Sequence, residues 1–126
     1  MATFRDVITQ SLEELGVLHV GETPSGDDVN DCFKRLNQML QSWELSGIDL
    51  EFQTETSIDD DVPYPESHIG PFACNLAVRL APAYGVSVSA ELAAFAEIGY
   101  RQVQNHHLKM RNLKADVGLT HRMPNW

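Results

Sequence analysis

The stretch GVLHVGETPSGDDVNDCFKRLNQMLQSWELSG, residues 16–47, contains a break followed by a long amphipathic pattern. Pro24 suits the first turn of a helix, where no backbone donor is needed, and the acidic residues after it favour the positive end of the helix dipole. We expect a helix that begins at Thr23 or Ser25 and ends at Gly47. Its apolar residues recur at alternating four- and three-residue steps, which predicts a wide buried face: Val29, Phe33, Leu36, Leu40 and Trp43.

The residues before this stretch predict a first helix from Phe4 to Leu15. Thr3 stands at the N-cap position, and Asp6 completes a capping box three residues later. Gly16 favours the left-handed conformation that ends a helix. The apolar residues of this segment then fall on one face.

A change of period follows the second helix. From Ile48, apolar or hydroxyl-bearing residues alternate with charged or polar ones, as is typical of a strand. An extended arm or short β-hairpin is therefore expected at 48–64. Its turn, Asp59–Asp61, lacks the ligand layout of a calcium loop, and a solvated turn is the better interpretation.

Two further helices are expected beyond residue 66. The first begins between Ser67 and Pro71 and ends at Gly85, and the second is capped by Ser89. The periodicity fades after Arg111, which predicts a flexible C-terminal tail.

The predicted fold is thus mainly α. A four-helix bundle-like domain comprises residues 1–111, with the extended arm at 48–64 between helices two and three, and residues 112–126 form a docking tail. The expected core contains Phe33, Leu36, Leu40, Trp43, Leu76, Leu80 and Phe95.

The composition limits the classes of protein to which the chain can belong. With 126 residues, 43% of them hydrophobic and 21% charged, the chain is long enough for one globular domain with its own core. No apolar run approaches the roughly 20 residues of a membrane span, and no signal-peptide pattern begins the sequence. We expect a protein made in the cytoplasm that has no membrane partner. Cys32 and Cys74 are expected to be reduced thiols, because two cysteines make neither a disulfide framework nor a zinc site.

The net charge of −9 is distributed unevenly. Through Glu66 there are 15 acidic and 3 basic residues, and from Ser67 onward there are 3 acidic and 6 basic residues, which gives −12 and +3. An acidic body argues against wrapping nucleic acid, since phosphate binding needs clustered Lys and Arg. It suits a surface that DNA slides past, and it equally suits ordinary solubilising charge.

No pattern in the chain predicts catalysis or metal binding. His106 and His107 are adjacent, so on a helix they point about 100° apart and do not form an i, i+4 metal-binding pair. His19, His68 and His121 lie in other segments and, like the adjacent pair, are expected to be surface or interface residues. There is no G-x-S-x-G turn and no phosphate-cradling glycine loop. We expect no catalytic residue, no cofactor and no metal, in a protein that is not an enzyme.

The end of the chain carries residues that suit an interface. A sparse basic series leads to a terminal Met and Trp, and aromatic and Arg side chains are favoured interface anchors, although termini also commonly fray. The candidate docking residues are Lys109, Arg111, Lys114, Arg122, Met123 and Trp126.

Two motifs resemble a known family. The break GETPS, residues 21–25, precedes a long helix that ends near Trp43, and the run NLAVRLAPAYG follows at residues 75–85. In both features the chain resembles the head-to-tail adaptors of tailed bacteriophages, also called tail accessory factors or packaged-DNA stabilisation proteins. The resemblance covers residues 1–107 and is absent from the last fifteen or so.

The resemblance implies a virion structural protein at the junction of capsid and tail. Such a protein forms a closed ring of about twelve copies beneath the portal protein, retains the packaged DNA and offers a platform to the next tail or nozzle protein. DNA passes through the channel without specific binding, and the C-terminal segment contacts the portal. Residues expected at the subunit interface or channel are Asp49, Glu51, Phe52, Glu55, Asp59, Asp60 and Asp61.

Two other classes remain open at the level of sequence. One is a small acidic regulatory or DNA-mimicking binder, which would be monomeric or dimeric and would compete with DNA for a basic partner. The other is an enzyme such as a lytic hydrolase, which would need a pocket of convergent titratable groups.

Overall fold

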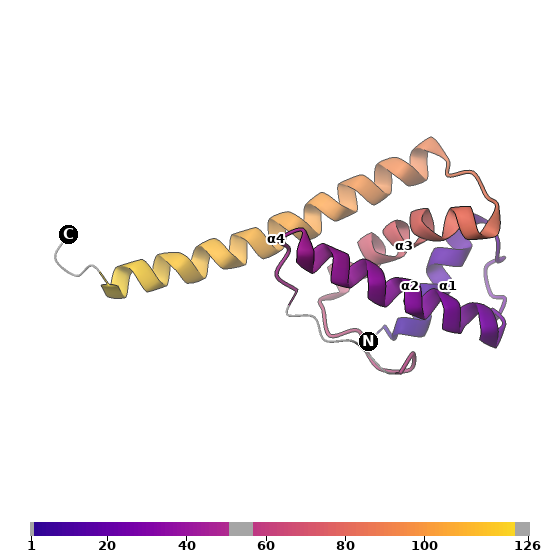
Figure 1. Ribbon diagram of the computed structural model, residues 1–126, viewed down its shortest axis with the longest axis horizontal. Helices are drawn as coiled ribbons and strands as arrows, with labels where there is room; N and C mark the ends of the chain where they lie inside the picture. Colours follow the sequence, from indigo (N-terminus) through magenta and orange to yellow (C-terminus); the bar gives the residue numbers. More distant parts are fainter. Residues whose placement is uncertain (1, 51–56, 123–126) are drawn as a thin grey trace.

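The computed structural model describes residues 2–50 and 57–122, with side chains described as far as Lys109. The helices follow in the order α1 (Phe4–Leu15), α2 (Gly26–Leu45), the short 3-10 helix η1 (Glu66–His68), α3 (Ile69–Tyr84) and α4 (Ala90–Arg122). Figure 1 shows a body built from α1, α2, α3 and the first half of α4, while the second half of α4 runs clear of the body. The expected mainly helical, bundle-like fold is confirmed.

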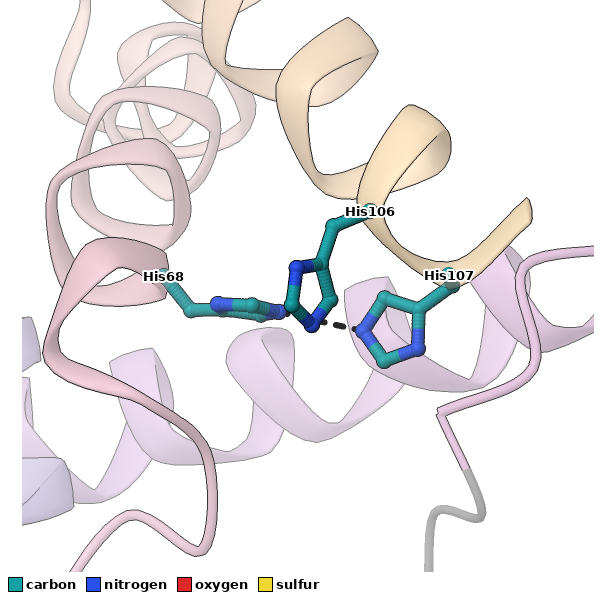
Figure 2. A group of neighbouring side chains, drawn as sticks. All are labelled: His68, His106 and His107. Carbon is teal, nitrogen blue, oxygen red and sulfur yellow. Dashed lines mark hydrogen bonds between the residues drawn. The ribbon is translucent and has the colours of Figure 1, made fainter. Parts of the chain in front are cut away.

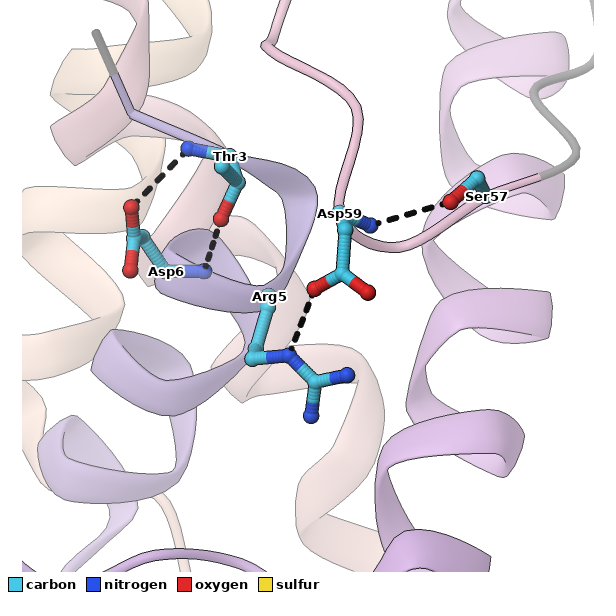
Figure 3. A network of polar contacts seen from close by, with 5 residues as sticks. All are labelled: Thr3, Arg5, Asp6, Ser57 and Asp59. Carbon is cyan, nitrogen blue, oxygen red and sulfur yellow. Dashed lines mark hydrogen bonds and ion pairs between the residues drawn. The ribbon is translucent and has the colours of Figure 1, made fainter.

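The ends of α1 are set by local chemistry, as the sequence predicts. The N–H of Asp6 donates to Thr3 Oγ1 at 3.2 Å, and the N–H of Thr3 donates to Asp6 Oδ2 at 2.9 Å, which completes the capping box (Figure 3). Gly16 closes the helix in the left-handed conformation, with φ +76°.

The start of α2 differs slightly from expectation. Ser25 is the N-cap and accepts a hydrogen bond from the N–H of Asp28 at 3.3 Å, so Pro24 precedes the cap and lies outside the first turn. The helix ends at Leu45, and Gly47 turns the chain with φ +95°.

The body is organised around α3, which packs against α1, α2 and α4. Its residues Phe72, Leu76 and Leu80 are buried, and Leu36, Leu40 and Trp43 of α2 are buried as well. Phe33 is half-buried and packs against the same core.

The approach of α4 to α3 is very close. A Cβ atom on Gly99 would lie 2.9 Å from both Cα and Cβ of Pro71, so no larger residue fits there without movement. The side-chain amide of Asn75 on α3 donates at 2.8 Å to the carbonyl oxygens of Pro71 and of Ala96 on α4. This amide therefore ties the two helices together where their backbones meet.

The expected core position of Phe95 is wrong, since this side chain is 60% exposed. The buried residues of α4 form a narrow stripe with steps of four and three: Leu92, Ala96, Gly99 and Val103. Phe95 flanks that stripe. Because α4 packs mainly against one helix, only a narrow face is covered.

The segment predicted as an arm returns to the body at both ends. Ile48, Leu50 and Val62 are buried in the common core. Within the described residues 48–50 and 57–64 there is no strand, and Thr3 and Asp61 form a single antiparallel bridge. Residues 51–56 lie outside the described residues, so a hairpin there stays a prediction.

The last helix is longer than the sequence indicated. Its periodicity fades after Arg111, yet α4 continues to Arg122, so most of the segment expected to be a flexible tail is helical. We refer to residues 108–122 as the outer arm, because Figure 1 shows this part of α4 standing away from the body.

Candidate functional site

A cluster of three histidines joins the start of α3 to α4 (Figure 2). His68 ends η1 and is 2% exposed, whereas His106 and His107 are consecutive residues of α4. The Nε2 atoms of His68 and His107 lie 3.0 Å apart and share a hydrogen bond. The ring centroid of His68 lies 5.1 Å from that of His106 and 5.2 Å from that of His107.

Aromatic and polar neighbours fix the orientation of the His68 ring. Tyr64 stacks on it with centroids 5.9 Å apart and an interplanar angle of 8°, and Phe72 meets it edge-on at 5.8 Å. The hydroxyl of Ser67 lies 3.4 Å from His68 Nδ1. The backbone of Asp49 is a polar neighbour of the His107 ring.

The environment favours neutral imidazoles. Burial, followed by the charges of His107 and His106, lowers the pKa of His68 from 6.5 to about 4. Burial and then the neighbouring His106 also lower the pKa of His107, against the opposing effects of Asp49 and Glu44. At neutral pH His68 is therefore uncharged and offers a lone pair on one ring nitrogen.

The sequence did not indicate this cluster, and the expectation that His68 is a surface or interface residue is wrong, because its side chain is buried. The adjacent histidines of α4 point in different directions, but His68 lies where both rings reach it, and one ligand nitrogen from each of the three residues falls within 4.8 Å of the others. A pocket of ≈ 270 Å³ lies beside the cluster and is lined by Ser67, Gln102 and Val103 together with two of the histidines. No local pattern could have indicated the site, because His68 is 38 residues from His106 in the sequence.

The acidic turn expected at an interface or channel is docked on the start of α1 (Figure 3). Nε of Arg5 donates to Asp59 Oδ1 at 2.9 Å, and this hydrogen bond lowers the pKa of Asp59. Asp60 and Asp61 are exposed. Asp49, at the other end of the segment, is exposed too, whereas Glu51, Phe52 and Glu55 lie outside the described residues.

The candidate docking residues all lie toward the C-terminal end. Lys109 is exposed on α4, and the backbone of α4 places Arg111, Lys114 and Arg122 on the outer arm. Met123 and Trp126 fall outside the described residues, so their role stays a prediction.

Exposed apolar side chains mark a second surface on α4. Phe95 and Ile98 are 60% and 53% exposed, and their three-residue spacing places them on one side of the helix. The body exposes Val20 and Leu45 even more fully. Apolar side chains in such positions are typical of surfaces that meet a partner when they form a contiguous patch.

Both cysteines are free thiols. Cys32 is buried, with its Sγ 3.6 Å from the hydroxyl of Tyr84, and Cys74 is half-buried. Burial raises the pKa of both thiols, so neither is an activated nucleophile.

No protein-family model matches the chain, and no curated protein sequence matches it either. The likeness to phage adaptors therefore rests on the two motifs quoted above. Within the described residues no helix has the length and apolar character needed to cross a membrane.

Proposed function

We propose that this protein is a head-to-tail adaptor of a tailed bacteriophage, a non-enzymatic ring subunit that joins the portal to the tail. The GETPS break and the NLAVRLAPAYG run support the family, and each has a structural role here. The first leads into the N-cap of α2, and the second forms most of α3, the helix that the other three contact.

The observation that carries the proposal is the outer arm (Figure 1). α4 has 33 residues, and the 15 residues of the outer arm would extend about 22 Å at 1.5 Å per residue. An isolated helix of this length is only marginally stable in water, because most helical stability in proteins comes from packing. A projecting helix of this kind suits a protein that acquires its packing partner on assembly.

Ring closure requires two different surfaces on each subunit, since every copy meets its neighbours head to tail. The body carries most of the acidic residues, including the exposed Asp60 and Asp61, whereas the outer arm carries four basic residues and one acidic residue. Phe95 and Ile98 lie near the base of the same helix. Charge complementarity and apolar burial together would let α4 of one copy contact the body of the next or the portal.

The mechanism is geometric. A closed ring beneath the portal leaves a central passage, and acidic residues along its wall would let DNA move without adhering, because DNA binding depends on pairing phosphates with Lys and Arg. The protein performs no reaction in this role.

The decisive experiment compares the full chain with a variant that lacks residues 112–126, each mixed with the cognate portal ring and weighed by mass photometry. We expect the full chain to add a ring of subunits to the portal and the shortened chain to remain free. Circular dichroism of the shortened chain should show a folded helical body, since the described core residues all precede residue 104. Binding of the shortened chain as tight as that of the full chain would refute the docking role.

The uneven charge favours one other function, an acidic binder that mimics DNA. Such a binder would not bind the portal and would compete with DNA for a basic partner. The same mass measurement separates the two functions, because only an adaptor adds many copies to a portal ring.

A further inference from the structure

We propose that His68, His106 and His107 form a binding site for one divalent transition metal ion, with Zn²⁺ as the ion. The site would link the end of η1 to α4 at the base of the outer arm. This inference concerns the isolated chain and does not depend on the adaptor function.

The chemistry of the three side chains matches such an ion. Imidazole nitrogen is a preferred ligand of zinc, copper and nickel, and three histidines with one open position are an established zinc ligand set. Within the described part of the chain this is the group of three ligand-type side chains whose donor atoms converge.

The distances require little rearrangement. Zn–N bonds of about 2.0–2.1 Å in a tetrahedral site place ligand nitrogens roughly 3.3–3.4 Å apart. The Nε2 atoms of His68 and His107 are 3.0 Å apart, and the three donor atoms lie within 4.8 Å of one another. Since His106 is exposed, its ring is free to rotate by the remaining distance, on the order of 1.5 Å.

The surroundings already hold one of the rings in place. Metal-binding histidines usually donate their second ring nitrogen to a polar neighbour, which fixes the tautomer and the orientation. Ser67 Oγ lies 3.4 Å from Nδ1 of His68, which leaves Nε2 of that ring for the ion. The backbone of Asp49 is a polar neighbour of His107 that could take the same part. Tyr64 stacks on His68 and restricts its tilt.

The adjoining pocket provides room for the remaining ligand. Its volume of ≈ 270 Å³ exceeds the roughly 10–15 Å³ that a cavity needs to hold one water molecule. Gln102 and Ser67 line it with polar groups that are suited to orienting a bound water. A water molecule, or a side chain of another subunit, would complete a four-coordinate site.

Binding at this place would affect the direction of α4. Val103 is the last described buried residue of the helix, and the two α4 histidines follow it within four positions. An ion shared with His68 would therefore fix the helix to the body at the point where its packing ends. We expect bound zinc to stabilise the chain, because a ligand that binds only the folded state shifts the unfolding equilibrium.

The test uses the full chain without a polyhistidine tag, stripped of metal with a chelator. Isothermal titration with Zn²⁺ should show one ion per chain, and Co²⁺ should give the visible absorption of a four-coordinate site. His106→Gln and His107→Gln, made separately, should each weaken binding by more than the roughly 10- to 100-fold that is lost when a residue hydrogen-bonded to a metal ligand is removed. His19→Gln is the matched control, since His19 is exposed and lies outside the cluster, and it should bind zinc as the original chain does.

The variant of His68 is the least informative, because this side chain is buried and its removal disturbs packing. The two α4 variants therefore decide the outcome, with circular dichroism to show that they fold. Absence of zinc binding in the original chain would overturn the proposal. Binding that persists undiminished in His106→Gln and His107→Gln, or that falls equally in His19→Gln, would overturn it as well.

Discussion

The contact between Gly99 and Pro71 makes a strong prediction about stability. In Gly99→Ala the new methyl group would lie 2.9 Å from Cα and Cβ of Pro71 and 3.3 Å from its Cγ. Carbon atoms in favourable contact are about 3.5–4.0 Å apart, so the two helices must separate by roughly 0.5–1 Å. Neither the backbone of α3 nor the ring of Pro71 can rotate away from the new methyl group.

Two opposing free energies decide the result. Replacing glycine by alanine inside a helix gains about 1 kcal/mol, because the unfolded chain loses freedom and the helix propensity rises. Overpacking a rigid contact costs about 1–3 kcal/mol. The obstructing atoms cannot yield, and separation would also stretch the 2.8 Å hydrogen bond from Asn75 to Ala96. We therefore take the upper end of the cost and expect a net loss of about 2 kcal/mol.

Gly26→Ala is the matched control. Gly26 lies in the first turn of α2, and a Cβ atom there would meet nothing within 4 Å. We expect this variant to be unchanged or more stable by up to about 1 kcal/mol. The two variants make the same chemical change and differ in the space available to the methyl group.

Urea denaturation followed by far-UV circular dichroism measures both variants against the original chain. The midpoint should fall for Gly99→Ala, with an unchanged slope, and should not fall for Gly26→Ala. If Gly99→Ala proved as stable as the original chain, the close packing of α4 on α3 would be refuted.

Two further predictions concern acid and the core. The pKa of His68 is about 4 in the folded chain against an ordinary 6.5, so the unfolded chain takes up the proton first as the pH falls. The free energy of unfolding is therefore highest above pH 6.5 and falls toward pH 4, by about 3 kcal/mol at about 1.4 kcal/mol per pH unit. Urea denaturation across this range should show a smaller fall in His68→Gln than in the original chain. Leu76→Ala should lower the free energy of unfolding by about 2–5 kcal/mol, because Leu76 is fully buried. Leu45→Ala, at a 90% exposed position, should change it by less than about 0.5 kcal/mol. Equal losses of the two variants in thermal unfolding would contradict the burial of α3.

The ends of helices were predictable where a few neighbouring residues determine them. The capping box of Thr3 and Asp6 and the left-handed Gly16 act within a single turn, so the sequence predicts α1 to the residue. The exposure of Phe95 was not predictable in this way. Its helical spacing fits the buried stripe, but the width of that stripe depends on how many helices cover α4.

The far end of α4 and the histidine cluster show two other limits. Periodicity indicates a helix only where one face of it is apolar, and the residues after Arg111 show no such face, so the sequence did not indicate that α4 continues to Arg122. The cluster depends on η1 and α4 being brought together by α3, and no local signal in either segment encodes that meeting. The acidic turn shows the same dependence, because its pairing with Arg5 joins residues 54 positions apart.

The attachment of the acidic turn to the beginning of α1 has a consequence for folding during synthesis. The N–H of Phe4 donates to the carbonyl oxygen of Asp60 at 3.2 Å, and the N–H of Arg5 donates to that of Ile58 at 2.8 Å. The N–H of Val62 donates to the carbonyl oxygen of Ala2. α1 also packs on α3, which ends at Tyr84. During synthesis α1 must therefore wait for its partners until the residues through Tyr84 have left the ribosome. Contacts so distant in sequence slow folding, and until they form the apolar face of α1 stays open to chaperones.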